Sequence, residues 1–163
     1  MVNTFYATDG KINVDILLAS ANTEFTLGER VSGNDGSVFV YCQANGAITG
    51  DGYVVLLDED FQATMINLTN SASAFGQSVG VVKTAFADNE YGWVQLSGTA
   101  NIRVSASAAA NTALNTTGTG GQIDDNAGSG AEVIDRMILT TANGGSAGTA
   151  EGVLNFPTVG ATL

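Results

Sequence analysis

Pairs of an acidic or amide residue with glycine recur along the chain, and they constrain its fold more than any other feature. Glycine follows Asp9, Asp35, Asn45, Asp51 and Asn143. Such pairs tolerate positive φ and form tight turns between antiparallel strands. The 21 Gly and the low share of charged residues, 13%, argue against a helical bundle. The sequence therefore predicts an all-β fold, an antiparallel β-sandwich or β-barrel with long loops of small residues.

Short strands are expected between these turns, within one domain that spans residues 1–163. The predicted strands are Lys11–Leu18, Ser37–Gln43, Tyr53–Asp58, Ala63–Leu68, Val79–Thr84, Tyr91–Ser97, Ala100–Ala106, Val133–Thr141 and Gly152–Phe156.

Alternation of side chains supports several of these strands. Ile12, Val14 and Ile16 share one face, as a half-buried strand requires. In residues 38–43 both faces carry large apolar side chains or Cys42, so a second sheet or a neighbouring subunit is expected to cover each side. The lone Cys42 has no partner for a disulfide and is predicted to be a buried small apolar residue.

Three stretches are harder to interpret. Residues 105–130 are nearly all small or polar, which predicts a long loop lying on a partner in preference to small-residue strands around a symmetry axis. Residues 131–142 fit either a short helix or a strand, and the following Asn143-Gly144 favours the strand. Pro157 is expected to end the last strand, because it cannot donate to a ladder.

Charge and composition exclude several functions. The net charge of −11 would repel a nucleic-acid backbone, so no nucleic-acid partner is expected. No apolar run has the length of a membrane span, and the first residues lack the basic and apolar regions of a signal peptide. We therefore expect a product made in the cytoplasm without a membrane partner.

No catalytic, cofactor or metal residue is predicted. The chain has no His, so Ser-His-Asp and Cys-His sites are impossible. Its acidic clusters, Asp58–Asp60, Asp88 with Glu90, and Asp124 with Asp125, are interpreted as solvated turns in preference to glycosidase-type pairs or calcium ligands. The protein is therefore expected not to be an enzyme.

One stretch is more specific than the rest. Phe86–Val104, FADNEYGWVQLSGTANIRV, combines an acidic turn, Tyr-Gly-Trp, a strand, a Ser-Gly break and a second strand of small and β-branched residues. This stretch resembles the signature of tailed-phage head decoration (cement) proteins. The resemblance extends over roughly residues 20–140, through the segments Phe25–Gly28, Gly33–Asp35, Val38–Tyr41, Ala44–Ile48 and Gly80–Val82.

The resemblance implies a structural virion protein. It also implies two partners, the major capsid protein and, in a homotrimer, the chain itself. It implies a place on the outer capsid surface between capsomers, where the protein stabilises the expanded, DNA-filled head. A virion-displayed glycan- or receptor-binding module and a tail component are the alternatives.

Five residues are candidates for a capsid or subunit interface. Val2, Phe5 and Tyr6 lie in a possible extended arm, residues 1–10, which could add a strand to the shell protein or form a flexible terminus. Alternation sends Tyr91, Trp93 and Gln95 to one face of their strand. Trp93 is expected first as a core residue, then as an interface residue, and last as a ligand contact.

Overall fold

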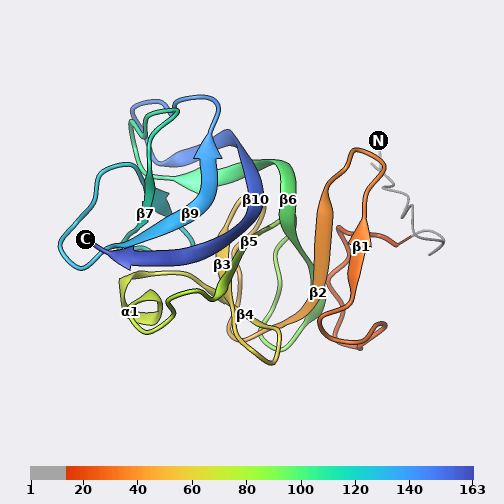
Figure 1. The fold of residues 1–163 in the computed structure, drawn as a ribbon. Coiled ribbons are helices and arrows are strands. Elements are labelled where there is room, and N and C mark those ends of the chain that lie inside the picture. The colour runs from red at the N-terminus through yellow and green to blue at the C-terminus, as the bar shows by residue number, and fades with distance from the viewer. Residues whose placement is uncertain (1–13) are drawn as a thin grey trace.

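The computed structural model describes residues 14–163, and these form strands with a single short helix (Figure 1). The all-β prediction is confirmed. The elements are β1 (Arg30–Ser32), β2 (Val38–Ala44), β3 (Val54–Leu57), β4 (Gln62–Met65), α1 (Leu68–Ser71), β5 (Ser78–Val82), β6 (Tyr91–Val104), β7 (Leu114–Thr116), β8 (Ile123–Asp124), β9 (Glu132–Leu139) and β10 (Gly148–Thr162).

The strands form one ten-stranded sheet whose pairings close on themselves twice. In the first ring, β2, β4, β3, β5 and β6 follow one another, and β6 pairs back with β2. In the second ring, β6, β8, β7, β9 and β10 do the same, and β10 pairs back with β6. The sheet is mixed and not purely antiparallel, because β2 pairs with β4, and β6 with β8, in parallel. Closure leaves few free strand edges.

Strand β6 belongs to both rings. The sequence predicted two strands here, yet residues 91–104 form one strand that bends at Gly98, where φ is +99°. The Gln95 amide donates to the carbonyl oxygens of Ser97 and Thr99, each at 3.0 Å, and so ties the two sides of the bend together. The half before the bend pairs with β2 and β5, and the half after it pairs with β10.

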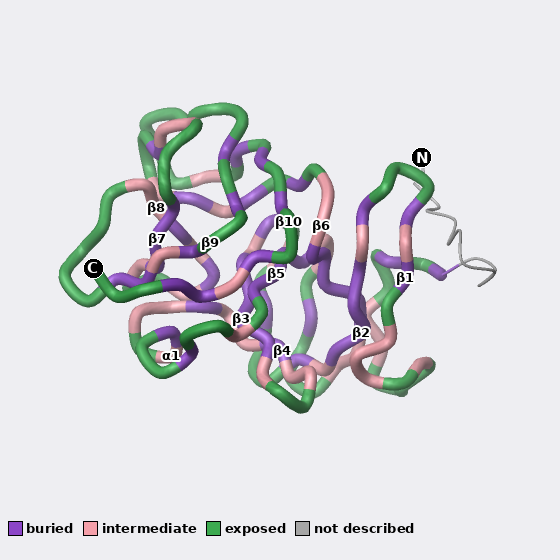
Figure 2. Tube along the Cα trace, viewed as in Figure 1, coloured by how far each residue is buried: buried purple, intermediate pink, exposed green. Residues whose placement is uncertain are grey.

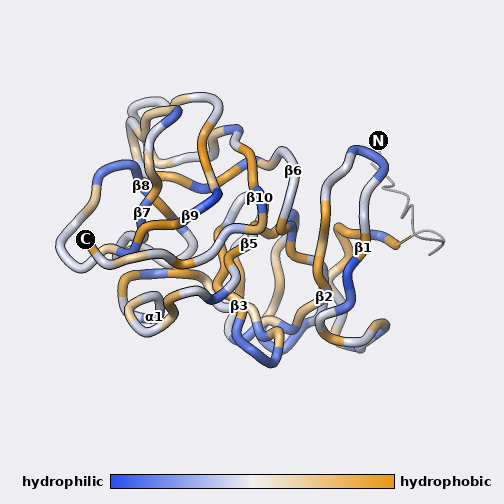
Figure 3. The backbone as a smooth tube through the Cα atoms, in the orientation of Figure 1, coloured by the Kyte–Doolittle hydropathy of each residue, from blue (hydrophilic) through white to orange (hydrophobic). Residues whose placement is uncertain are grey.

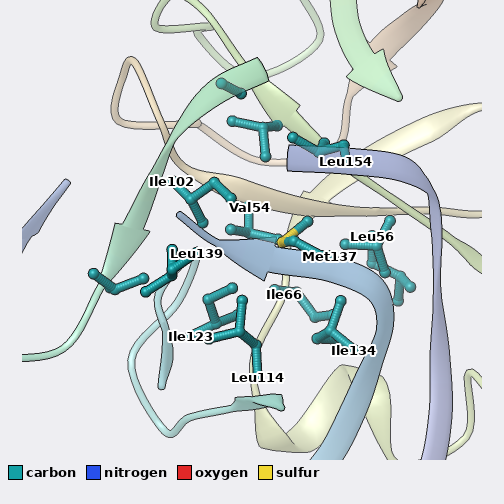
Figure 4. Packing of buried hydrophobic residues seen from close by; sticks show 14 of the residues in the cluster. Val54, Leu56, Ile66, Ile102, Leu114, Ile123, Ile134, Met137, Leu139 and Leu154 are labelled. Carbon is teal, nitrogen blue, oxygen red and sulfur yellow. The ribbon is translucent and has the colours of Figure 1, made fainter. Parts of the chain in front are cut away.

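Three hydrophobic clusters fill the fold. Figure 2 shows that the buried stretches of the chain lie largely in the strands. The first-ring cluster contains Val40, Cys42, Phe86, Val94 and Leu96, among others. The second-ring cluster includes Ile66, Ile102, Leu114, Ile123, Ile134, Met137, Leu139 and Leu154, which Figure 4 shows converging from several strands. The aromatic cluster contains Val14, Ile16, Val31, Phe39, Tyr41 and Trp93.

The clusters share strands, and alternation explains how. In β3, Val54 and Leu56 enter the second-ring cluster, while Val55 and Leu57 enter the first-ring cluster. Strand β2 is covered on both sides, as predicted, with one face in the first-ring cluster and the other in the aromatic cluster. The cover comes from this chain's own segments, so no neighbouring subunit is needed for it.

The first predicted strand is not seen in its described part. Residues 14–18 form no strand, and residues 11–13 lie outside the described part of the chain. The Asp15 carboxylate accepts a hydrogen bond from the Leu17 N–H at 2.9 Å, which makes a turn that competes with a ladder. Val14 and Ile16 are nevertheless buried and Asp15 and Leu17 exposed, so the predicted faces are correct although the strand is not.

Two further predictions need correction in the middle of the chain. The strand expected over Ala63–Leu68 ends at Met65, because the Asn67 side chain accepts hydrogen bonds from the Thr69 and Asn70 N–H groups and begins α1. The aromatic side chain of Phe75 is 80% exposed in the turn that follows α1. Residues 105–130 are not one loop, since β7 and β8 lie within them and complete the second ring.

The C-terminal part of the chain is more regular than expected. Residues 132–139 form a strand, as the Asn-Gly signal indicated. Strand β10 continues past Pro157 to Thr162, so this proline does not end it. Pro157 lies where the register with β9 shifts between Leu154 and Thr158, a bulge in which no ladder donor is required.

Candidate functional site

The acidic turn before β6 is held by its own carboxylates. Asp88 Oδ1 accepts from the Gly46 N–H at 2.8 Å, and Glu90 Oε2 accepts from the Ala87 N–H at 2.7 Å. Asn89 between them has φ +66°, a left-handed conformation that Asn tolerates. The acidic residues of the signature therefore shape the turn that leads into β6.

Gly92 allows a close approach of Phe86 to the strand. A Cβ atom at position 92 would lie 2.6 Å from Phe86 Cζ, and Phe86 is itself 2% exposed. On the opposite face of β6, Trp93 enters the aromatic cluster. The Tyr-Gly-Trp part of the signature thus places one aromatic ring on each side of the same backbone.

Tyr91 and Trp93 lie on one face of β6, as predicted. The Trp93 ring lies 5.0 Å from Tyr41 and 5.2 Å from Phe25, centroid to centroid, and its side chain is buried inside the chain. Tyr91 is partly buried and stacks on Tyr41 at 6.3 Å. Trp93 therefore occupies the core position that was expected first, and of the two only Tyr91 offers surface to a partner.

A cavity of about 140 Å³ lies beside this aromatic cluster. Asp15, Glu24 and Ser20 supply its polar lining, and Leu18, Phe25 and Tyr91 part of its apolar lining. A sugar-stacking site would need an exposed pair of aromatic faces. Because Trp93 is buried and Tyr91 is covered on one side by Tyr41, residues 91 and 93 do not provide such a pair.

The other three candidate interface residues, Val2, Phe5 and Tyr6, lie outside the described residues, as does the rest of the predicted arm. The structure therefore brings together only Tyr91 and Trp93 from the predicted set.

Of the other acidic clusters, Asp58–Asp60 also forms a turn. Asp58 Oδ1 accepts from the Asp60 and Gln62 N–H groups at 3.0 and 2.8 Å. Within residues 14–163, no three His, Cys, Asp or Glu side chains gather where they could hold a metal ion. The same residues contain no helix with the length and apolarity of a membrane span.

Cys42 is fully buried in the first-ring cluster, as predicted, and burial raises the pKa of its thiol from 9.0 to about 12. We expect a disulfide reagent at pH 8 to label the native protein no faster than it unfolds, and urea to speed the labelling. The folded pKa of this thiol lies above the unfolded one, because burial favours the neutral form. The free energy of unfolding is therefore unaffected by the thiol below pH 9 and falls as the pH rises toward 12. Rapid labelling of the native protein would contradict the burial.

The sequence analysis missed one surface. Ile138, Val153 and Phe156 are large apolar residues that expose 38–39% of their area on β9 and β10. The only sequence signal for them is an apolar residue at an outward position of a strand, which by itself is common on protein surfaces.

No protein-family model matches the chain, and no curated protein matches it either.

Gly92→Ala tests whether residue 92 must be glycine to make room for the Phe86 ring. We expect the free energy of unfolding to fall by about 1–3 kcal/mol, because the added methyl group must displace the buried Phe86 ring. Urea denaturation followed by circular dichroism measures the change. Gly144→Ala is the matched control, since an added Cβ there meets no atom within 4 Å. Equal stability of the two variants would show that Phe86 does not constrain residue 92.

Proposed function

We propose that this protein is a decoration protein of a tailed-phage head. It binds the outer capsid surface between capsomers, as a homotrimer, and stabilises the expanded, DNA-filled shell. The observation that carries the proposal is the order and spacing of the signature in Phe86–Val104 together with its upstream segments.

The roles of the signature residues support this proposal, because a structural contact or a backbone conformation explains each of them. Gly92 admits Phe86, Trp93 fills the aromatic cluster, and Gly98 bends β6 where it passes from one ring to the other. A sequence pattern that specifies a closed β scaffold is the kind that a structural protein needs. The net charge of −11 also suits the outer face of a shell filled with DNA.

The mechanism would be preferential binding to the assembled shell. A protein that bridges neighbouring capsomers binds the intact head and not the separated subunits, so it shifts the equilibrium toward the head. A trimer binds through three linked contacts, and modest affinity at each contact is then sufficient.

Co-sedimentation with capsids tests the proposal. Purified protein is mixed with expanded heads that lack it and, in parallel, with unexpanded procapsids. We expect saturable binding to the expanded heads and little binding to procapsids. Absence of binding to both would overturn the proposal and direct attention to a glycan-binding module or a tail component.

A further inference from the structure

The outer face of β9 and β10 carries three exposed apolar side chains. Ile138 and Val153 are direct cross-strand partners, and they expose 39% and 38% of their area. Phe156, three residues further along β10, exposes 38%. Single exposed apolar residues are ordinary, whereas several on one pair of strands mark an interaction surface.

A bulge in β10 holds Phe156 on the outer face. Leu154 pairs with Met137 and Thr158 pairs with Asp135, so three residues of β10 face the single residue Arg136 of β9. Phe156 and Arg136 both have left-handed backbones, with φ +52° and +62°. Such conformations are unfavourable for residues other than Gly. Bulges that contain them are common at functional sites, where they change the direction of a side chain.

A shallow groove runs beside this bulge. It has a volume of about 480 Å³, with β9 along one side and Asn111–Ala113 along the other. Arg136, Ile138 and Asn155 contribute to its lining. Figure 3 shows β9 as two hydrophobic stretches separated by a hydrophilic one, which corresponds to Asp135 and Arg136. We call this surface, with Val153, Phe156 and Arg30, the β9–β10 groove.

Two arginines lie on this surface, Arg136 in the lining of the groove and Arg30 beside Phe156, together with one carboxylate, that of Asp135. The Arg30 guanidinium lies 5.9 Å from the centre of the Phe156 ring, and Arg136 is exposed. Neither forms an ion pair within residues 14–163. The chain has 16 acidic and 5 basic residues, so two arginines that have no ion pair among the described residues, beside an apolar stripe, favour an acidic partner. The carboxylate that lines the groove, Asp135, lies over the Gly160 position of β10.

We propose that the β9–β10 groove binds an extended, acidic segment of the shell protein, an inference that rests on the proposed function. An apolar side chain of that segment packs against Ile138, Val153 and Phe156, and its carboxylates pair with Arg30 and Arg136. A second copy of this chain is the alternative occupant, and the sedimentation of the free protein tests it.

Arg136→Glu tests the assignment, with Lys83→Glu as the matched control that makes the same change in charge away from the groove. Ile138→Ser removes the apolar contact separately. Affinity for expanded heads is measured by co-sedimentation at low and moderate salt, and the melting temperature of each variant checks its fold. We expect Arg136→Glu to weaken binding by about tenfold or more, Ile138→Ser to weaken it as well, and Lys83→Glu to leave it unchanged. The wild-type affinity should fall as salt increases.

The outcomes separate the two proposals. If the wild-type protein does not bind heads, the proposed function and the groove assignment both fail. If it binds and Arg136→Glu and Ile138→Ser bind equally well, only the groove assignment fails. If the variants change the sedimentation of the free protein and leave head binding intact, the groove joins copies of this chain and the shell assignment is overturned.

Discussion

Trp93→Ala is expected to lower the free energy of unfolding by about 3–5 kcal/mol, the usual cost of removing a large aromatic side chain from a packed interior. Trp93 exposes only 2% of its surface and contacts the rings of Phe25 and Tyr41. Truncation leaves a cavity on the face of β6 and β2 that the aromatic cluster covers, and the paired strands beneath it cannot easily move inward.

Urea denaturation followed by far-ultraviolet circular dichroism measures the loss. Trp93→Phe should cost less, because it keeps one ring in the cluster. Phe75→Ala is the control, since this aromatic side chain is 80% exposed and its removal is expected to change stability by no more than about 0.5 kcal/mol. A loss from Trp93→Ala as small as that from Phe75→Ala would mean that the aromatic cluster is not part of the stable core.

Local alternation was sufficient to predict the strands that are buried on two faces. In β2 and in the first half of β6, the side-chain period of two assigns each residue to a face, and the structure has the same assignment. The pattern succeeds there because large side chains point alternately into two buried clusters, the first-ring cluster and the aromatic cluster.

Pairings between distant segments could not be predicted in this way. Strands β7 and β8 contain three and two residues, and only Leu114 and Ile123 anchor them in the second-ring cluster. Their neighbours are too small and polar to produce a period. The short parallel pairings of β2 with β4 and of β6 with β8 likewise depend on where the closed rings place the strands.

The candidate surfaces were predictable to different degrees. The positions of Tyr91 and Trp93 follow from one strand, so sequence alone assigned them correctly to a common face. The β9–β10 groove requires Arg30, Arg136 and Phe156, which are far apart in the sequence and meet only in the folded chain. Each of these residues is unremarkable on its own strand, and only their proximity indicates a binding surface.

Ile102→Ala is expected to cost about 2–5 kcal/mol and to shift the same unfolding transition as Trp93→Ala. Ile102 is fully buried in the second-ring cluster and packs on Gly152 of β10, where an added Cβ would lie 2.5 Å from Ile102 Cδ1. Ile102 and Trp93 lie in different clusters and on the same strand, β6. Because β6 completes both rings, neither ring retains all its pairings when the other unfolds.

Two probes of one denaturation experiment test this coupling. Trp93 is the only Trp of the chain, so its fluorescence reports on the aromatic cluster, while circular dichroism reports on all strands. In Ile102→Ala both signals should move to the same lower urea midpoint, as two-state unfolding requires. A circular dichroism transition that precedes an unchanged fluorescence transition would show that the second ring unfolds alone, and the expectation of a single domain over residues 1–163 would then be wrong.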